Sequence, residues 1–119
     1  MHLITRALSV MTILSCFLWT MPVSAASPPL EKGSASWYRY KGCLCAASPD
    51  FQKGTKLRVT NQKNGKSVIV TVNDYGPNRK KYPTRAIDLD AVAFQKIGRL
   101  SQGLVSVTVE KVIPSKQLP

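Results

Sequence analysis

The chain has 119 residues and a formal net charge of +11, with 17 Lys and Arg against 6 Asp and Glu. This length predicts one domain and no more. The strongly basic balance predicts attraction to a polyanion, with simple solubility as the plainer alternative. The one histidine, His2, lies at the start of the chain, so we expect no Cys-His or Ser-His catalytic pair in the domain.

Residues 1–25 have the pattern of a secretory signal peptide. A basic start precedes an apolar run over residues 7–21, and small residues at 23–25 suit a cleavage site. A transmembrane anchor is the alternative, but a run of about fifteen residues is short for a span of roughly 20. Lipid attachment at Cys16 is a second alternative. Export predicts a secreted or periplasmic protein of the cell envelope, where the polyanions are wall polymers, peptidoglycan carboxylates and lipid head groups rather than nucleic acid.

The predicted domain covers residues 33–113, after a Pro-containing linker at 26–32 and before a tail at 114–119. Its first strand is expected from Gly33 to Arg39, where alternation places Ser36 and Tyr38 on one face and Trp37 on the other. Trp37 suits either a plug of the interior or a flat platform for a sugar ring.

Residues 40–54 are expected to be irregular, because Gly42, Pro49 and Gly54 interrupt them. Cys43 and Cys45 lie within this stretch. An oxidising compartment permits a disulfide between them, although the ring would close over a single residue. Zinc is not expected, because no further Cys or His follows.

Two alternating runs at 55–60 and 67–73 predict paired strands, joined by a hairpin at 61–66 whose Asn64-Gly65 supplies a positive φ. A basic loop at 78–85 follows. The sequence then predicts a short helix at 91–97, with Asp90 as its N-cap.

The remaining elements are predicted from their apolar residues. The helix is expected to bury Val92 or Ala93 together with Ile97. A last strand is expected at 104–112, with one face made of Val105, Val107 and Val109.

Asp74 follows directly on the strand at 67–73. Strict alternation, with Val72 inward and Asn73 outward, would turn Asp74 back toward the interior edge. A half-buried carboxyl there would lose solvation and hold its proton more readily, which suits a general acid. The alternative is an Asp that accepts hydrogen bonds from turn amides around Gly76.

Several stretches of the chain resemble the rare lipoprotein A family and the bacterial expansins. They are VTVNDYGP at 70–77, RAIDLD at 85–90, GSASWY at 33–38, KGTKLRVTN at 53–61 and NGKSVIV at 64–70. The resemblance implies a mainly β protein, a small six-stranded double-psi β-barrel with one short helix. It also implies a protein that acts on the cell wall.

The resemblance further implies a site. Asp74 and Asp88 would be the catalytic carboxylates, since both positions lie on the polysaccharide groove of expansins. The substrate-binding residues would be Ser36, Trp37, Tyr38, Asn73, Tyr75 and Arg85. The chain departs from the family in two respects: an expected Glu is missing, and Ala46-Ala47-Ser48 replaces Ala-Ala-His.

Two classes of function follow from the resemblance. The first is an endolytic lytic transglycosylase, in which one Asp protonates the glycosidic oxygen and then accepts a proton from the C6 hydroxyl of the same sugar, closing a 1,6-anhydro ring. The second is a non-hydrolytic, expansin-like module that loosens wall polysaccharide. A plain wall-binding protein is a third possibility. For all three we expect a monomer that binds peptidoglycan or another wall polysaccharide, without cofactor, metal, nucleic acid or a membrane span after cleavage.

Overall fold

The structure is a computed structural model that describes residues 15–20 and 30–114. The predicted cleavage site at 23–25 and nearly all of the predicted tail lie outside these residues. Cys16 is exposed and forms no disulfide with the other described cysteines. No helix in the described ranges is both long and apolar enough to cross a membrane.

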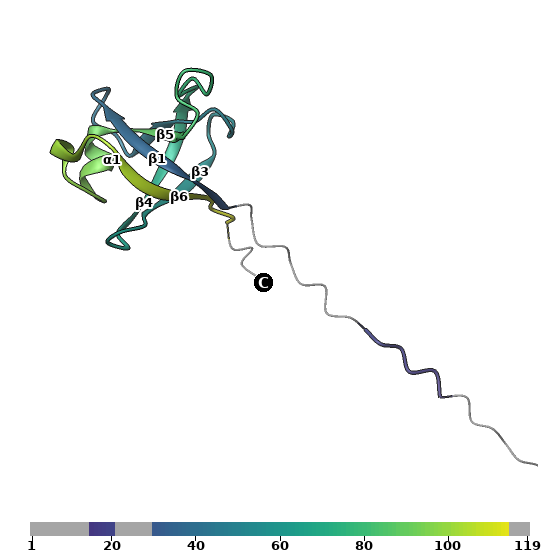
Figure 1. Cartoon of the computed structure of the whole chain (residues 1–119). Helices are drawn as coiled ribbons and strands as arrows, with labels where there is room; N and C mark the ends of the chain where they lie inside the picture. Colours follow the sequence, from purple (N-terminus) through teal and green to yellow (C-terminus); the bar gives the residue numbers. More distant parts are fainter. Residues whose placement is uncertain (1–14, 21–29, 115–119) are drawn as a thin grey trace, which may run out of the picture.

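Six strands close into a barrel in the order β1-β5-β2-β4-β3-β6 (Figure 1). This confirms the predicted mainly β fold, a six-stranded double-psi β-barrel with one short helix. The elements are β1 Leu30–Tyr38, β2 Cys45–Ala47, β3 Lys56–Asn61, β4 Ser67–Asp74, β5 Arg85–Asp90, α1 Ala91–Gln95, the 3₁₀ turn η1 Leu100–Gln102 and β6 Val105–Lys111.

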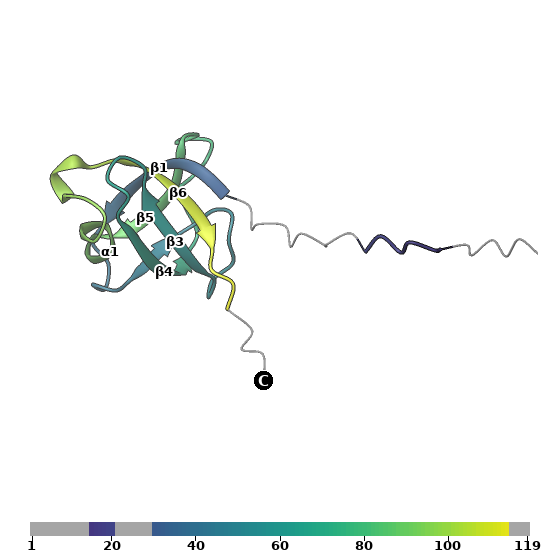
Figure 2. The ribbon, with the colours of Figure 1, turned by 90° about the horizontal axis from the view of Figure 1, so that it is seen from below.

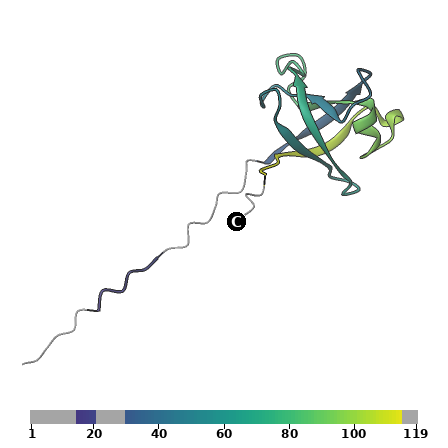
Figure 3. The same cartoon turned by 180° about the vertical axis from the view of Figure 1, so that it is seen from behind.

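Alternation along the strands fills the interior with aliphatic side chains, as the sequence predicts. The fully buried branched residues on the strands include Leu57, Val59, Ile87, Leu89 and Val107. The end of the barrel near α1 and η1 lies away from the end where the chain enters β1 (Figure 2). The hairpin at 61–66 and the loop at 75–84 project at opposite sides of the barrel (Figure 3).

Two boundaries differ from the prediction because their hydrogen-bond partners are distant in sequence. The predicted linker 26–32 overlaps β1, since Leu30 to Lys32 pair with β6 through Glu110 to Thr108. The stretch 40–54 is not wholly irregular, since it contains β2, which pairs with both β4 and β5. All three residues of β2 are buried, so this strand has no alternation of polar and apolar residues from which it could be predicted.

The structure also corrects the predicted loop and helix boundaries. Arg85 belongs to β5 rather than to the basic loop, because it pairs with Ser34. The helix ends at Gln95, two residues early. Asp90 is confirmed as its N-cap, with Oδ1 accepting from the Val92 amide at 3.0 Å. Of the predicted helix residues, Ala93 and Ile97 are buried while Val92 is 37% exposed.

Gly33 marks a close approach of β1 to the start of β5, and it gives a test of this packing. A Cβ on Gly33 would lie 2.8 Å from the Ala86 Cβ and 2.9 Å from the Thr84 carbonyl oxygen. We expect Gly33→Ala to lower the free energy of unfolding by about 1–3 kcal/mol through overpacking. Lys32→Ala on the same strand is the control, because Lys32 is exposed. Urea unfolding measures both, and equal stability of the two variants would contradict the packing.

Candidate functional site

The two predicted catalytic carboxylates lie on one row of residues across the outside of the barrel. Ser36 pairs with Asp88, Asp88 with Ala47, and Ala47 with Asp74. The row therefore crosses β1, β5, β2 and β4 in order. Asp88 and Asp74 flank Ala47 two strand spacings apart, which is about 10 Å between Cα atoms.

A register shift between Ala46 and Ala47 sets the direction of Asp74. Ala46 pairs with Val72 while Ala47 pairs with Asp74, so Asn73 is the extra residue of a bulge. A bulge re-aims the side chain that follows it. The prediction that Asp74 is half-buried toward the interior is therefore wrong, since Asp74 is exposed. Its Oδ1 accepts from the Tyr75 amide at 2.8 Å, one of the turn contacts that the sequence allowed.

Asp88 is held by two neighbours. The Ser36 hydroxyl donates to its Oδ1 across the β1–β5 pair, and the Arg85 Nε lies 3.9 Å from the same oxygen. Arg85 in turn lies over the ring of Tyr82, 4.2 Å from its centroid. The structure thus brings together Ser36, Asp88 and Arg85, three of the predicted site residues.

Tyr38 has a buried hydroxyl with no hydrogen-bond partner among the described residues. Burial raises the pKa of this phenol above its ordinary 10.0, and the charges of Asp74, Asp90 and Asp88 add to the effect in that order. The phenol therefore remains protonated and able to donate a hydrogen bond. The Asn73 Oδ1 is a second buried atom left without a partner in the described structure, and it is an acceptor on the residue before Asp74.

The two predicted aromatic site residues Trp37 and Tyr75 lie in different environments. Trp37 pairs with Leu89, packs partly against the core and donates its Nε1 hydrogen to the Leu100 carbonyl at 2.9 Å. These contacts fit the plug interpretation, and they place Trp37 away from the row. Tyr75 is 70% exposed next to Asp74, with the Lys53 ammonium 4.8 Å from its ring centroid.

The structure joins Cys43 to Cys45 in a disulfide. Their sulfurs and an Asp90 carboxylate oxygen lie within 4.8 Å of one another, which is close enough for three metal ligands. Because the sulfurs are bonded to each other, they are not available as thiolates. This cluster instead ties the start of β2 to the helix cap, since the Gly42 amide donates to Asp90 Oδ2 at 3.2 Å.

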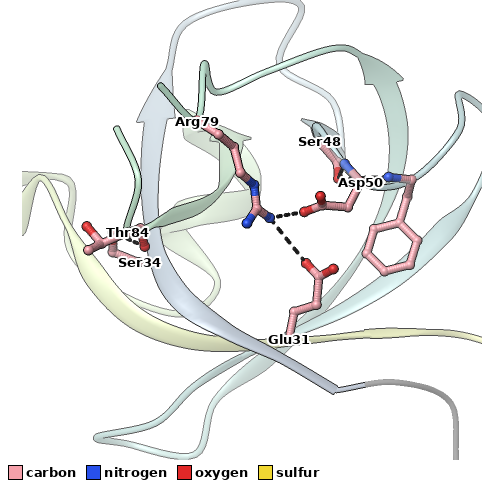
Figure 4. A network of polar contacts seen from close by, with 7 residues as sticks. Glu31, Ser34, Ser48, Asp50, Arg79 and Thr84 are labelled. Carbon is pink, nitrogen blue, oxygen red and sulfur yellow. Dashed lines mark hydrogen bonds and ion pairs between the residues drawn. The ribbon is translucent and has the colours of Figure 1, made fainter. Parts of the chain in front are cut away.

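A polar network that the sequence did not reveal lies at the end of the barrel where β1 begins (Figure 4). Arg79 from the 75–84 loop pairs with Asp50 and lies 3.8 Å from Glu31. Glu31 pairs with Val109, a buried interior residue, so its side chain points into this end. No local pattern links these positions, because they come from three separate segments.

Ser48 connects this network to the row. Its amide donates to the Asp74 carbonyl at 3.1 Å, and its hydroxyl accepts from the amides of Asp50 and Phe51 at 3.3 Å each. Arg79 and Arg85 also share a hollow of about 230 Å³ with Glu31. Ser48, which replaces the expected His, therefore stabilises a turn here.

Comparison with known proteins agrees with this geometry. A family model described as lytic transglycolase matches residues 30–109. The chain is 38% identical over 103 residues to the endolytic peptidoglycan transglycosylase RlpA of Neisseria meningitidis, covering 75% of this chain and 42% of that protein. It is 38% identical over 107 residues to the RlpA of Pseudomonas aeruginosa, covering 78% of this chain and 30% of that protein. The chain thus spans less than half the length of these relatives.

Solved structures share the fold. An expansin of Clavibacter michiganensis superposes with a TM-score of 0.57 at 22% identity, covering 72% of this chain and 52% of the other. A variant of that expansin, solved in complex with cellohexaose, gives 0.57 at 20% identity over 76% of this chain and 54% of the other. A Streptomyces papain inhibitor gives 0.56 at 23% identity over 74% of this chain and 98% of the other.

Glu31 gives a test of the network through its pH dependence. Burial, followed by the charge of Asp50 and a hydrogen bond with it, raises the pKa of Glu31 above its ordinary 4.5, against the opposing effect of Arg79. A raised folded-state pKa means that protonated Glu31 stabilises the fold below pH 4.5, and that this stability is lost as the pH rises through the folded-state pKa. Glu31→Gln cannot ionise. We therefore expect its Tm relative to wild type to rise over this pH window.

Thermal unfolding across that pH range measures the effect. Glu110→Gln is the matched control, because Glu110 pairs with Arg58 on the outside of the barrel. A Tm difference for Glu31→Gln that stays flat or falls with rising pH would contradict the assigned environment.

Proposed function

The chain belongs to the lytic transglycolase family, whose model covers its barrel, and we propose that it is an endolytic peptidoglycan lytic transglycosylase. It would cleave glycan strands and leave 1,6-anhydromuramic ends. The row that carries Asp88 and Asp74 on the outside of the barrel is the observation that supports this most. The names of the RlpA relatives support the same activity.

The proposed reaction uses one proton and no water. Asp74 gives its proton to the glycosidic oxygen as the bond to C1 breaks, and the leaving sugar departs as an alcohol. The resulting carboxylate then accepts the proton of the C6 hydroxyl as that oxygen bonds to C1. Asp74 ends protonated again, so the cycle closes. An exposed carboxyl beside the turn is accessible to a polymer, and a single acid is sufficient for this route.

The surrounding groups take positioning roles in this proposal. Asp88, fixed by Ser36 and Arg85, stabilises the positive charge that develops at the sugar ring. The Tyr38 hydroxyl would donate to a substrate oxygen, and the Asn73 Oδ1 would accept from a substrate hydroxyl, once rotation of the side chains exposes these two atoms, which are buried in the free protein. Sites that hydrogen-bond a substrate leave such groups unpaired until the substrate binds.

A non-hydrolytic, expansin-like module is the second candidate. Tyr75 favours it, because an aromatic ring that is 70% exposed beside the carboxylates presents a stacking surface for a sugar. Both candidates place the protein in the cell envelope, exported and acting as a monomer on wall polysaccharide.

Asp74→Asn separates the two candidates. The amide cannot donate the required proton, so we expect the formation of anhydromuramic ends to fall by about 100-fold or more, as for loss of a general acid. Mass spectrometry of purified glycan strands after digestion measures the ends. Glu110→Gln is the control for a carboxyl-to-amide change remote from the row. Unchanged cleavage by Asp74→Asn would contradict the mechanism, and binding by wild type without any new ends would favour the expansin-like module.

Tyr38→Phe tests the role of the orphaned hydroxyl. Because this hydroxyl makes no hydrogen bond to the described residues, we expect its removal to leave Tm unchanged or higher. Loss of one hydrogen bond to the substrate should lower kcat/KM by about tenfold. Tyr40→Phe is the matched control, since its ring lies 6.0 Å from that of Tyr38 and is 53% exposed. A large fall in Tm with normal turnover would show a structural role instead.

A further inference from the structure

A hollow whose lining includes three lysines lies at the end of the barrel where β4 finishes, and the proposed mechanism does not use it. Its volume is about 480 Å³. It is lined by Lys53, Gly54, Thr55, Lys56, Lys111, Val112 and Pro114. The lining therefore includes three lysines and no acidic residue.

The positive charge of this hollow is not neutralised within the described part of the protein. The ion pairs among residues 30–114 all use arginine, and none includes a lysine. Arg58 and Arg79 engage three of the carboxylates, those of Glu110, Asp50 and Glu31. A concave surface lined by one sign of charge focuses the field and attracts the opposite charge.

Backbone hydrogen bonds join one wall of the hollow to β4, the strand that carries Asp74. The Gly54 amide donates to the Val72 carbonyl at 2.8 Å, and the Val72 amide donates to the Thr55 carbonyl at 2.9 Å. Val72 lies two residues before Asp74. The Lys53 ammonium also lies over the Tyr75 ring. A polymer in contact with Tyr75 therefore meets the Lys53 ammonium, and Lys53 also lines the hollow with Lys56 and Lys111.

We propose that this lysine hollow binds carboxylate groups of an acidic wall glycan and holds the strand beside Asp74. Lys suits this role, because its ammonium is a compact point charge with three donors. A flat anionic bilayer is the less suitable partner, since the three lysines line a concavity rather than a flat face. The inference rests on the proposed function only for the class of polymer, because the hollow itself requires only negative charge.

The test compares two triple variants with the same change in net charge. The first combines Lys53→Glu, Lys56→Glu and Lys111→Glu. The second combines Lys63→Glu, Lys66→Glu and Lys96→Glu. These lysines are exposed on the hairpin and after α1, away from the hollow. Both carry Asp74→Asn, so that the polymer stays intact. Sedimentation with purified peptidoglycan measures binding at about 0.01 M and about 0.15 M salt, where screening differs strongly.

We expect the hollow variant to bind about tenfold more weakly at low salt while the control variant binds nearly normally. Peptidoglycan with amidated carboxyls should remove the difference. Equal losses in both variants would show that net charge alone matters and would overturn the proposal. Two further results would overturn the proposal. The first is that the hollow variant loses binding to vesicles of anionic phospholipid but not to peptidoglycan. The second is that amidation of the peptidoglycan carboxyls leaves binding by the wild type unchanged.

A second set of variants guards against misfolding. If the charge reversal lowers Tm, the same three positions are changed to Gln, which removes the charge without adding repulsion, and normal binding by that variant would overturn the proposal. The cleavage assay is separate from this one. The hollow variant could lose binding while the wild type produces no anhydromuramic ends. That pair of results would support the hollow and contradict the transglycosylase proposal.

Discussion

The whole site depends on the hydrogen bonding of one three-residue strand. β2 runs parallel to β4 and antiparallel to β5, so its residues fix the register of both neighbours at once. Ala47 is the point where this matters, because it pairs with Asp88 on one side and Asp74 on the other. A slip of one residue in β2 would replace Ala47 between the two carboxylates and change how Asp88 and Asp74 are aligned across the row.

Features with local causes could be predicted from the sequence. The alternating valines gave the interior faces of β4 and β6, Asn64-Gly65 gave the hairpin, and Asp90 gave the cap, because each depends on residues a few positions apart. Non-local features could not be predicted. β2 and the first residues of β1 are strands only because distant segments pair with them. The outward direction of Asp74 depends on a bulge against β2, which strict alternation cannot anticipate.

The distribution of charge separates two kinds of surface at the same end of the barrel. Three arginines are neutralised: Arg58, Arg79 and Arg85 each lie within 4 Å of a carboxylate, and they hold loops and strands together. In the described ranges the lysines make no such pairs, so their charge acts on the surroundings. Asp74 has no ion pair with any described residue, so under the proposal it stays accessible beside a positive field that would attract an anionic strand.

Two unpartnered atoms on the strands of the row raise the free energy of the folded protein. A buried hydroxyl or amide oxygen without a partner costs stability, and folded proteins keep few of them. Here the atoms are the Tyr38 hydroxyl on β1 and the Asn73 Oδ1 on β4, one donor and one acceptor. A sugar hydroxyl both donates and accepts. In the proposed function, a ring that reaches the two atoms would therefore satisfy both and remove this unfavourable contribution to the free energy.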